Sequence, residues 1–275
     1  VIIGDNNLEK LLPQLYPLNF QFIIIDECHF MRNGSTHRTK NINKLLKRIN
    51  RCLLLSGTPA YSSIADIDKI IGHLYPLNIS NYKEFIIRNE KADKLTLQPI
   101  VTKNILVTNA NVCNDSMANC GIAKVPTIME TVTGILQRTD DSVIIFYHFN
   151  SVRDMIVQAL SNKYRDDKDH YVMLNGEDNL GVQSMNVLAF EHDSDCRIII
   201  ANLQCGEACW NLNTANHVIF AEIPFTIGSL TQAEARCHRI GQQKEVFRYL
   251  FHVETEFDRI QKLNTEMNRI HDFYS

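Results

Sequence analysis

The sequence lacks any apolar run near the roughly 18 residues that a membrane-spanning helix needs, and it opens without a secretory signal. It also has no Cys-x-x-Cys pair, and its eight cysteines show no zinc-site spacing with histidine. We therefore expect no membrane partner, no cysteine–histidine metal centre, and free thiols in a reducing, intracellular compartment.

A strong overall charge is missing too. The net charge is −3 and the pI about 6.4, so any nucleic acid would have to be held by a local basic surface. What the chain does have is a hydrophobic fraction of 45% over 275 residues. That fraction is enough for a sizeable core, and the length predicts two domains.

Acidic residues follow the first strand-like segment. Residues 22–25 are apolar at every position, which is typical of a parallel strand buried on both faces, and residues 8–17 before them have helical spacing. Side chains at the carboxyl end of such a strand face a ligand crevice. Asp26 there suits a magnesium ion, held directly or through water, and Glu27 suits the polarisation of an attacking water in nucleotide hydrolysis. A solvated acidic turn is the alternative.

A second apolar strand, residues 52–55, runs into a hydroxyl-rich turn. In a parallel sheet this turn would lie beside the acidic residues, because the carboxyl ends of neighbouring strands meet at one edge. Two polar tetrads would then share one crevice. They read Asp26-Glu27-Cys28-His29 and Ser56-Gly57-Thr58-Pro59.

The most basic stretch of the chain is a predicted helix over residues 39–50. Its apolar positions form one stripe, and cations collect elsewhere on it. Lysine-rich outer faces are normal on soluble helices, so a solvated face is the first interpretation and a phosphate-contacting face is the alternative. The cations are Lys40, Lys44, Lys47, Arg48 and Arg51.

Two arginines stand three residues apart in segment 232–243, which reads Gln-Ala-Glu-Ala-Arg-Cys-His-Arg-Ile-Gly-Gln-Gln. A helix here would place the guanidinium groups of Arg236 and Arg239 on one face. Arginine keeps its charge and offers a planar fork of donors, which suits the charge that develops on a transferring phosphoryl group. A solvated helix face is the alternative.

These segments resemble the motifs of a known family. Asp-Glu-Cys-His followed by Leu-Leu-Leu-Ser-Gly-Thr-Pro resembles motifs II and III of superfamily 2 helicase-like ATPases. Gln-Ala-x-x-Arg-x-His-Arg-Ile-Gly-Gln resembles motif VI of the Swi2/Snf2 branch. Within that branch, the similarity is greatest to the HepA-related (HARP) annealing helicases, over residues 22–33, 53–60, 124–156 and 215–242.

The resemblance implies an α/β fold of two RecA-like lobes with mostly parallel sheets, the first lobe incomplete. It implies ATP and magnesium as cofactors, with the metal at Asp26. We expect the acidic residues and Ser56 on one side of a cleft and the arginine pair on the other. The implied catalytic residues are Asp26, Glu27, Arg236 and Arg239, and those that couple the motifs are His29, Ser56, Gly57, Thr58, Gln232 and Gln242.

The chain divides into a first lobe over residues 1–106, a linker over 107–123 and a second lobe over 124–275. The linker is proposed because residues 107–121 are rich in Asn, Ala, Cys and Gly and show little periodicity. In the second lobe, alternating elements predict another doubly wound sheet. Its strands are expected at 143–146, 171–174, 197–201 and 217–221, and its helices from 127, from 151 and over 255–273.

Several positions depart from the family pattern. Cys209-Trp210-Asn211-Leu212 stands where a Gly-Leu-x-Leu run is usual, and Ala235 replaces the Asp expected before Arg236. Glu177 stands where a hydroxyl that meets DNA is expected, and a carboxylate there would repel phosphate.

The chain also has no Gly-x-Gly-Lys-Thr-like loop to hold the β and γ phosphates of a nucleotide. Truncation upstream would explain this, and so would loss of the loop in a degenerate or viral-type copy. We therefore expect little or no ATPase activity from these residues by themselves, because charge stabilisation requires that the phosphates first be positioned.

The resemblance implies part of a DNA-dependent ATPase motor that acts in replication-fork remodelling and DNA repair. DNA is the implied partner, in the form of forks or single/double-strand junctions, and nothing in the sequence names a protein partner. The implied location is the nucleus, or the host nucleus for a viral-type protein. Two alternatives are a catalytically inactive clamp for nucleic acid or protein, and the motor of a chromatin remodeller.

Overall fold

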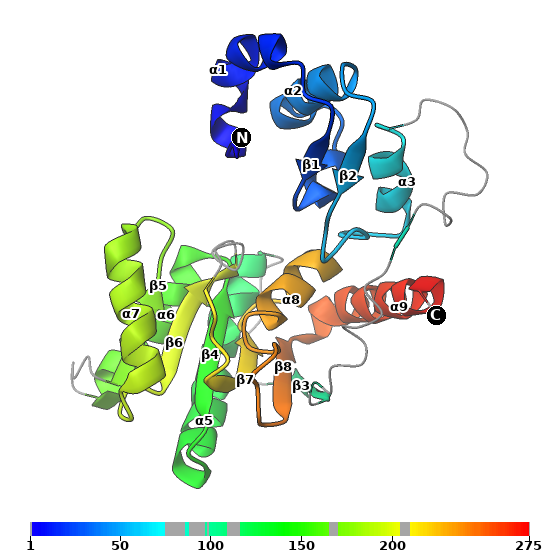
Figure 1. The fold of residues 1–275 in the computed structure, drawn as a ribbon. Coiled ribbons are helices and arrows are strands. Elements are labelled where there is room, and N and C mark those ends of the chain that lie inside the picture. The colour runs from blue at the N-terminus through cyan, green and yellow to red at the C-terminus, as the bar shows by residue number, and fades with distance from the viewer. Residues whose placement is uncertain are drawn as a thin grey trace. The chain divides into compact units, whose positions relative to one another are not determined.

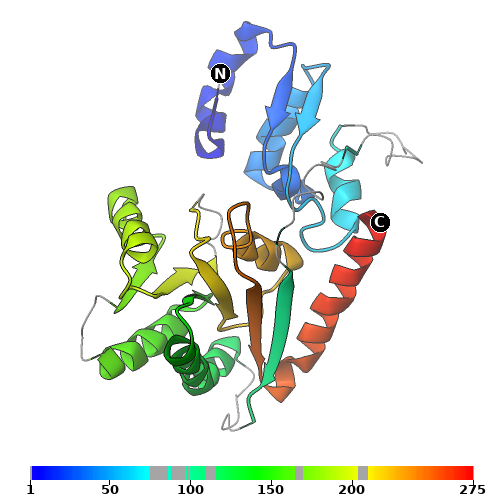
Figure 2. The same cartoon turned by 60° about the horizontal axis from the view of Figure 1, so that its bottom comes forward.

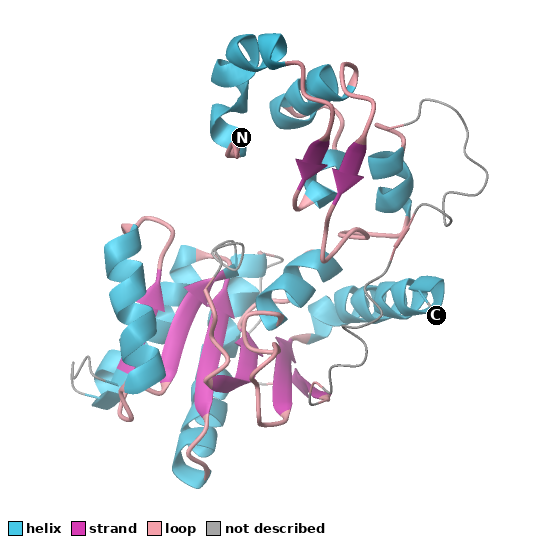
Figure 3. Cartoon of the chain, in the orientation of Figure 1, coloured by secondary structure: helices cyan, strands magenta, loops and turns pink. Residues whose placement is uncertain are grey.

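The computed structural model describes residues 2–74, 86–87, 97, 99–108, 116–164, 170–203 and 210–274. The chain forms two compact units: unit 1 comprises Val1–Asn89 with Glu266–Ser275, and unit 2 comprises Glu90–Thr265. Figure 1 labels their elements in chain order, and Figure 3 colours helices cyan and strands magenta. Both units combine helices with parallel strands, which confirms the predicted α/β class.

Unit 1 contains a two-stranded parallel sheet of β1 (Ile23–Ile25) and β2 (Cys52–Leu54). Helix α2 (His37–Leu46) lies between the two strands in the chain, and it is capped by Thr36, whose side chain accepts a hydrogen bond from the backbone N–H of Thr39. Its other helices are α1 (Asp5–Leu15) and α3 (Ala65–Ile71), with short 3₁₀ turns at Tyr16–Leu18 and Cys28–Arg32.

The prediction that these strands are buried on both faces is wrong. Side chains of α1, α2 and the Cys28–Arg32 turn pack against the face that carries Ile25, which is 7% exposed. On the other face, Ile24 is 58% exposed and Leu53 is 43% exposed. The run of apolar residues therefore predicted the strands correctly. It did not show which face of the sheet is packed against helices.

Unit 2 is built on a six-stranded sheet with the order β3-β8-β7-β4-β6-β5. Every neighbouring pair is parallel. In Figure 2 the edge strand β3 lies alongside β8. The strands are β3 (Ile100–Leu106), β4 (Ser142–Tyr147), β5 (Tyr171–Leu174), β6 (Ile198–Asn202), β7 (Ala215–Phe220) and β8 (Val246–His252).

The main core of unit 2 lies between the central strands and two helices, α5 and α6, and includes the fully buried Ile128, Ile145 and Ile156. The last residue of α8, Glu234, accepts a hydrogen bond from Arg248 of β8. The described helices are α5 (Met117–Arg138), α6 (Asn150–Tyr164), α7 (Leu180–His192), α8 (Ile227–Glu234) and α9 (Phe257–Tyr274), and the residues of α9 from Glu266 onward belong to unit 1.

Strands β3 and β8 were not predicted from the sequence, and α5 starts ten residues before the predicted position, running through Pro126. Packing overrides the proline there, because the early turns of α5 are buried against α6. A Cβ on Gly121 would lie 2.6 Å from Val152 Cγ2, so only glycine permits this approach.

The predicted lobe boundaries do not coincide with these packing units. Strand β3 falls in the predicted first lobe but pairs with β8 of unit 2, and α5 starts inside the predicted linker. The division at residues 106 and 123 stays a prediction for the working lobes of the protein. Over the described ranges, no helix is long and apolar enough to cross a membrane.

Candidate functional site

The two polar tetrads of unit 1 lie at one edge of its sheet. Beyond the last strand residues, Leu55 N–H donates to Ile25 O at 2.9 Å, and Cys28 N–H donates to Leu55 O at 2.8 Å. These hydrogen bonds hold the loop after β1 against the turn after β2. The predicted common edge is therefore present.

His29 connects the two loops through its side chain. It is buried, and its Nδ1 lies 3.1 Å from Glu27 Oε2 and 3.4 Å from Ser56 Oγ. An ionised carboxylate only accepts hydrogen bonds, so Nδ1 donates its proton to Glu27. The contact of Nδ1 with Ser56 Oγ is longer and therefore weaker. Ser56 Oγ also accepts the backbone N–H of Thr58 at 3.1 Å, which orders the turn.

The backbone of Glu27 adopts the left-handed conformation, with φ at 49°. For a residue with a Cβ this conformation costs about 1–2 kcal/mol, and such strain concentrates where a side chain must be aimed. The Glu27 N–H donates to Asp26 Oδ1 at 2.9 Å, which holds the Asp26 carboxylate against the backbone of Glu27. The carboxylate of Glu27 stays 56% exposed and accessible to water.

Tyr61 and Arg32 support His29, and the sequence analysis missed both. The rings of His29 and Tyr61 stack with centroids 4.8 Å apart, and Arg32 Cζ lies 4.1 Å from the Tyr61 ring centroid. Arg32 Nη1 also donates to His29 O at 2.9 Å. Tyr61 lies just beyond the motif that ends at Ala60, and no spacing rule singles it out.

Cys28 lies between Glu27 and His29 in the sequence, but its thiol is unreactive. Burial, with the negative charge of Glu27 adding to it, raises the pKa of the Cys28 thiol to about 12. The thiol is therefore neutral at physiological pH and suits neither nucleophilic attack nor metal binding. In the described part of the chain, no group of three or more His, Cys, Asp or Glu side chains could hold a metal ion by itself.

The two arginines of unit 2 do not lie on a helix, so the prediction that helical spacing aligns them is wrong. Helix α8 ends at Glu234, and the chain continues in tight turns: His238 N–H donates to Glu234 O at 2.8 Å, and Arg239 N–H donates to Cys237 O at 3.1 Å. Gly241 then takes a φ of 106°, which turns the chain toward β8. In this arginine turn (residues 235–242) Arg236 is half-buried and Arg239 is exposed.

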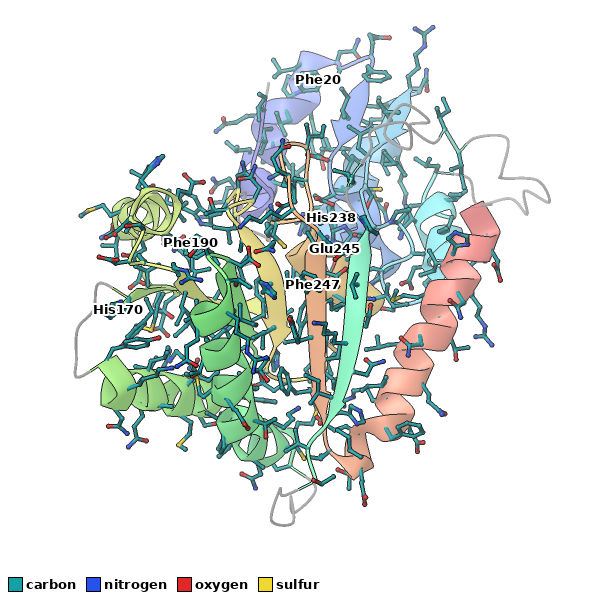
Figure 4. The ribbon with its side chains drawn as sticks, turned by 90° about the horizontal axis from the view of Figure 1, so that it is seen from below. Phe20, His170, Phe190, His238, Glu245 and Phe247 are labelled. Carbon is teal, nitrogen blue, oxygen red and sulfur yellow. The ribbon has the colours of Figure 1, made fainter. Side chains whose placement is uncertain are left out.

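Gln242 holds the arginine turn in place. Its buried amide donates to Ala215 O at 2.8 Å and Asn213 O at 2.9 Å, at the start of β7. Leu212 N–H in turn donates to Arg236 O at 2.8 Å. Gln242 thus supports the arginine turn through backbone contacts. Gln232 lies on α8, before the arginine turn begins. Figure 4 labels His238, in the arginine turn, and Phe247, in β8.

A buried ion pair supports the end of α8. Arg248 Nη1 lies 2.7 Å from Glu234 Oε1, and Arg248 Nη2 donates to Thr102 Oγ1 of β3 at 2.6 Å. Burial raises the pKa of Glu234, while the neighbouring guanidinium acts in the opposite direction. The pair ties α8, β8 and β3 together directly before the arginine turn.

Two of the departures from the family pattern lie on the surface. Ala235 is exposed at the end of α8, and Glu177 is exposed in the turn after β5. Cys209 lies outside the described residues. The acidic residues and the arginines belong to different units, and their facing each other across a cleft stays a prediction.

Two protein-family models match this chain. The SNF2-related domain matches residues 1–112, and the helicase conserved C-terminal domain matches residues 123–241. The chain therefore contains an SNF2-related domain followed by a helicase conserved C-terminal domain. Domains of the SNF2 family imply the use of a nucleotide together with a metal ion.

Curated SNF2 relatives confirm the resemblance to annealing helicases. DNA annealing helicase and endonuclease ZRANB3 of Mus musculus is 23% identical over 86% of this chain and 28% of its own length. SWI/SNF-related matrix-associated actin-dependent regulator of chromatin subfamily A-like protein 1 is 24% identical in Xenopus laevis, over 89% of this chain and 32% of the relative. In Drosophila melanogaster it is 26% identical, over 94% and 42%. The chain spans less than half the length of each.

Among solved structures, one similar chain is titled "Crystal structure of the C-terminal part of Fun30 ATPase domain". It is 21% identical, with a TM-score of 0.47, and the match covers 72% of this chain and 57% of that one.

Proposed function

We propose that this chain is part of a DNA-dependent ATPase motor of the annealing-helicase type, acting in replication-fork remodelling and DNA repair in the nucleus. The family match and the names of the relatives support the motor class. The observation that carries the proposal is the contact of His29 with both Glu27 and Ser56, because it joins two strand-end loops around an exposed carboxylate.

ATP with magnesium is the proposed cofactor. Mg²⁺ is bound in such proteins through one or two carboxylates, with the remaining positions taken by substrate phosphates and water. Asp26 suits this kind of coordination. Its side chain is oriented by a hydrogen bond from the Glu27 N–H, and the residue lies at the edge of the sheet. A bound magnesium ion would neutralise charge that develops on the phosphates.

Glu27 is the proposed group that orients and polarises the attacking water. The Nδ1 proton of His29 holds one carboxylate oxygen, and the Glu27 side chain is 56% exposed, so water can reach the carboxylate. Because His29 also contacts Ser56, a movement of the Ser56-Gly57-Thr58 turn would shift the imidazole and with it the Glu27 carboxylate. That link is a physical basis for coupling DNA contact to hydrolysis.

Arg236 and Arg239 are the proposed stabilisers of the transferring phosphoryl group. Their guanidinium groups would act when the two lobes close on ATP, and the backbone contacts of Gln242 hold their turn in one shape. DNA forks and single/double-strand junctions are the proposed substrates, by analogy with the annealing-helicase relatives.

An inactive nucleic-acid clamp is the second candidate. The exposed carboxylate of Glu177, at a position where the family pattern has a hydroxyl, favours relaxed constraint in the second lobe. Ala235 favours it too, because no carboxylate there orients Arg236.

The test is ATP turnover by a polypeptide that joins this chain to a phosphate-binding loop. A motor hydrolyses ATP faster with forked DNA than without it, whereas a clamp binds the same DNA with no turnover. The 275-residue chain by itself is expected to show little or no turnover. Robust DNA-stimulated turnover by this chain alone would contradict that expectation.

A further inference from the structure

Helix α2 and the turn after it carry an unusual concentration of positive charge. No Asp or Glu occurs between Cys28 and Ala65, although the chain as a whole has a net charge of −3. Five of the cations in this stretch are exposed, and we call them the basic stripe: Lys40, Lys44, Lys47, Arg48 and Arg51.

The three lysines of the stripe lie on one face of α2. Lys40, Lys44 and Lys47 are spaced four and three residues apart, so they stand above one another on α2. The opposite side of the helix is buried through Ile42 and Leu45. Arg48 and Arg51 follow in the turn that leads into β2, and both are exposed.

Helix stability alone does not explain this arrangement. Like charges four residues apart destabilise a helix by about 0.2–0.5 kcal/mol per pair, and cations in a first turn oppose the helix dipole. The first turn of α2 has no acidic residue and carries Lys40. Ordinary solvated faces intersperse both signs, which this one does not.

Neighbouring side chains orient part of the stripe. Arg48 Cζ lies 4.1 Å from the ring centroid of Tyr16, and Lys44 Nζ donates to Asn41 Oδ1 at 3.0 Å. The far end of the stripe is at the amino end of the sheet, because Arg51 O accepts the backbone N–H of Ile23 at 3.1 Å. Asp26 and Glu27 are at the carboxyl end, so the far end of the stripe is separate from the proposed nucleotide site.

We propose that the basic stripe is a second nucleic-acid contact, which binds the phosphodiester backbone independently of sequence. It rests on the proposed function in taking nucleic acid as the ligand. A phosphate backbone presents regularly spaced negative charge, which a row of exposed lysine and arginine side chains matches, with affinity that falls as salt rises. Such a contact would hold DNA on unit 1 throughout the nucleotide cycle.

The test is binding of the 275-residue chain to labelled duplex and single-stranded DNA over a range of salt concentrations. The stripe variant is Lys44→Gln, Lys47→Gln and Arg51→Gln together, which leaves Arg48 on Tyr16. A control variant removes the same charge elsewhere, through the exposed Lys10→Gln, Arg138→Gln and Lys262→Gln. Circular dichroism checks that both fold, and Lys47→Gln alone serves if the triple variant does not.

The stripe variant should reduce the magnitude of the negative slope of log affinity against log salt by about 2.7 for duplex and about 2.1 for single strands, and Lys47→Gln alone should reduce it by about 0.9 for duplex. The control should keep the slope of the wild-type chain. Equal slopes for wild type and stripe variant would overturn the proposal, as would an absence of DNA binding or equal binding of polyglutamate. ATP turnover that does not respond to DNA would contradict the proposed motor function. It would not bear on the salt slopes, which test the basic stripe.

Discussion

Glu27 and His29 are joined by a contact of 3.1 Å between Oε2 and Nδ1, and the backbone of Glu27 is left-handed, with φ at 49°. The same imidazole nitrogen reaches Ser56 at 3.4 Å. Backbone strain of this kind clusters at functional sites, which supports the proposed role of the Glu27 carboxylate.

Replacing Glu27 with glycine should therefore stabilise the chain while removing the group that activates water. Glycine relieves the left-handed strain, and its own entropic cost leaves a net gain of up to about 1 kcal/mol. Glu27→Gln is the matched control, because it keeps both the Cβ and the strain. Urea unfolding compares the two, and a glycine variant no more stable than the glutamine variant would show that the position is unstrained.

The stack of His29 on Tyr61 should control the position of the imidazole. Tyr61→Leu removes the aromatic ring, so the ring protons of His29 should move downfield in the NMR spectrum, whereas Tyr61→Phe should leave them nearly in place. In an assembled motor the leucine variant should also lose about tenfold in turnover, within the range of a misplaced catalytic group. Identical His29 resonances in both variants would mean that Tyr61 does not position the ring.

Much of this site was predictable because its signals are local. Apolar strands followed by polar tetrads located Asp26, Glu27 and Ser56, and parallel pairing brought them to one edge. Tyr61 and Arg32 escaped because stacking depends on how a loop folds back. The arginine turn was misassigned because a spacing of three fits both a helix and consecutive turns, and Gly241 with Gln242 decides between them.

The larger misses have a similar cause. Strands β3 and β8 hold polar residues such as Lys103 and Arg248 among apolar ones, so no apolar run marked them. Their pairing depends on contacts distant in sequence, including that of Arg248 with Thr102. The helix was predicted from residue 127, directly after Pro126, whereas α5 starts at Met117 and is closely packed at Gly121.

Replacing Arg236 or Arg239 with lysine should slow ATP turnover in an assembled motor and leave DNA binding nearly unchanged. Lysine keeps the charge but loses the planar fork, and an arginine in this role is worth about 10³-fold or more in turnover. Ala235→Asp should raise the coupling between DNA and hydrolysis if it orients Arg236. Parallel loss of DNA binding and turnover in the lysine variants would mean that the arginines hold the strand.

Unit 2 should lose stability in acid through Asp141. Burial alone would raise the pKa of Asp141, but hydrogen bonds from Lys244 and His217 outweigh it and lower the pKa from 3.8 to about 2. A lowered pKa favours the folded state above pH 3.8, and this contribution disappears as the pH falls through about 2. Thermal melts of Asp141→Asn should therefore lie below wild type near neutral pH and converge with it over that interval.

The exposed neighbour provides the control for this pH effect. Asp140→Asn removes the same charge one residue away and should follow the wild-type melting curve at every pH. If the deficit of Asp141→Asn is the same at pH 6 as at the acid end, the ionised carboxylate contributes no stability of its own.

The most direct test of the central claim is ATP turnover, with and without forked DNA, by this chain joined to a phosphate-binding loop, compared with its Glu27→Gln variant. The account predicts turnover that rises with DNA in the parent, and a variant that retains nucleotide and DNA binding but hydrolyses almost no ATP. Turnover that is indifferent to DNA, or unchanged by Glu27→Gln, would contradict it.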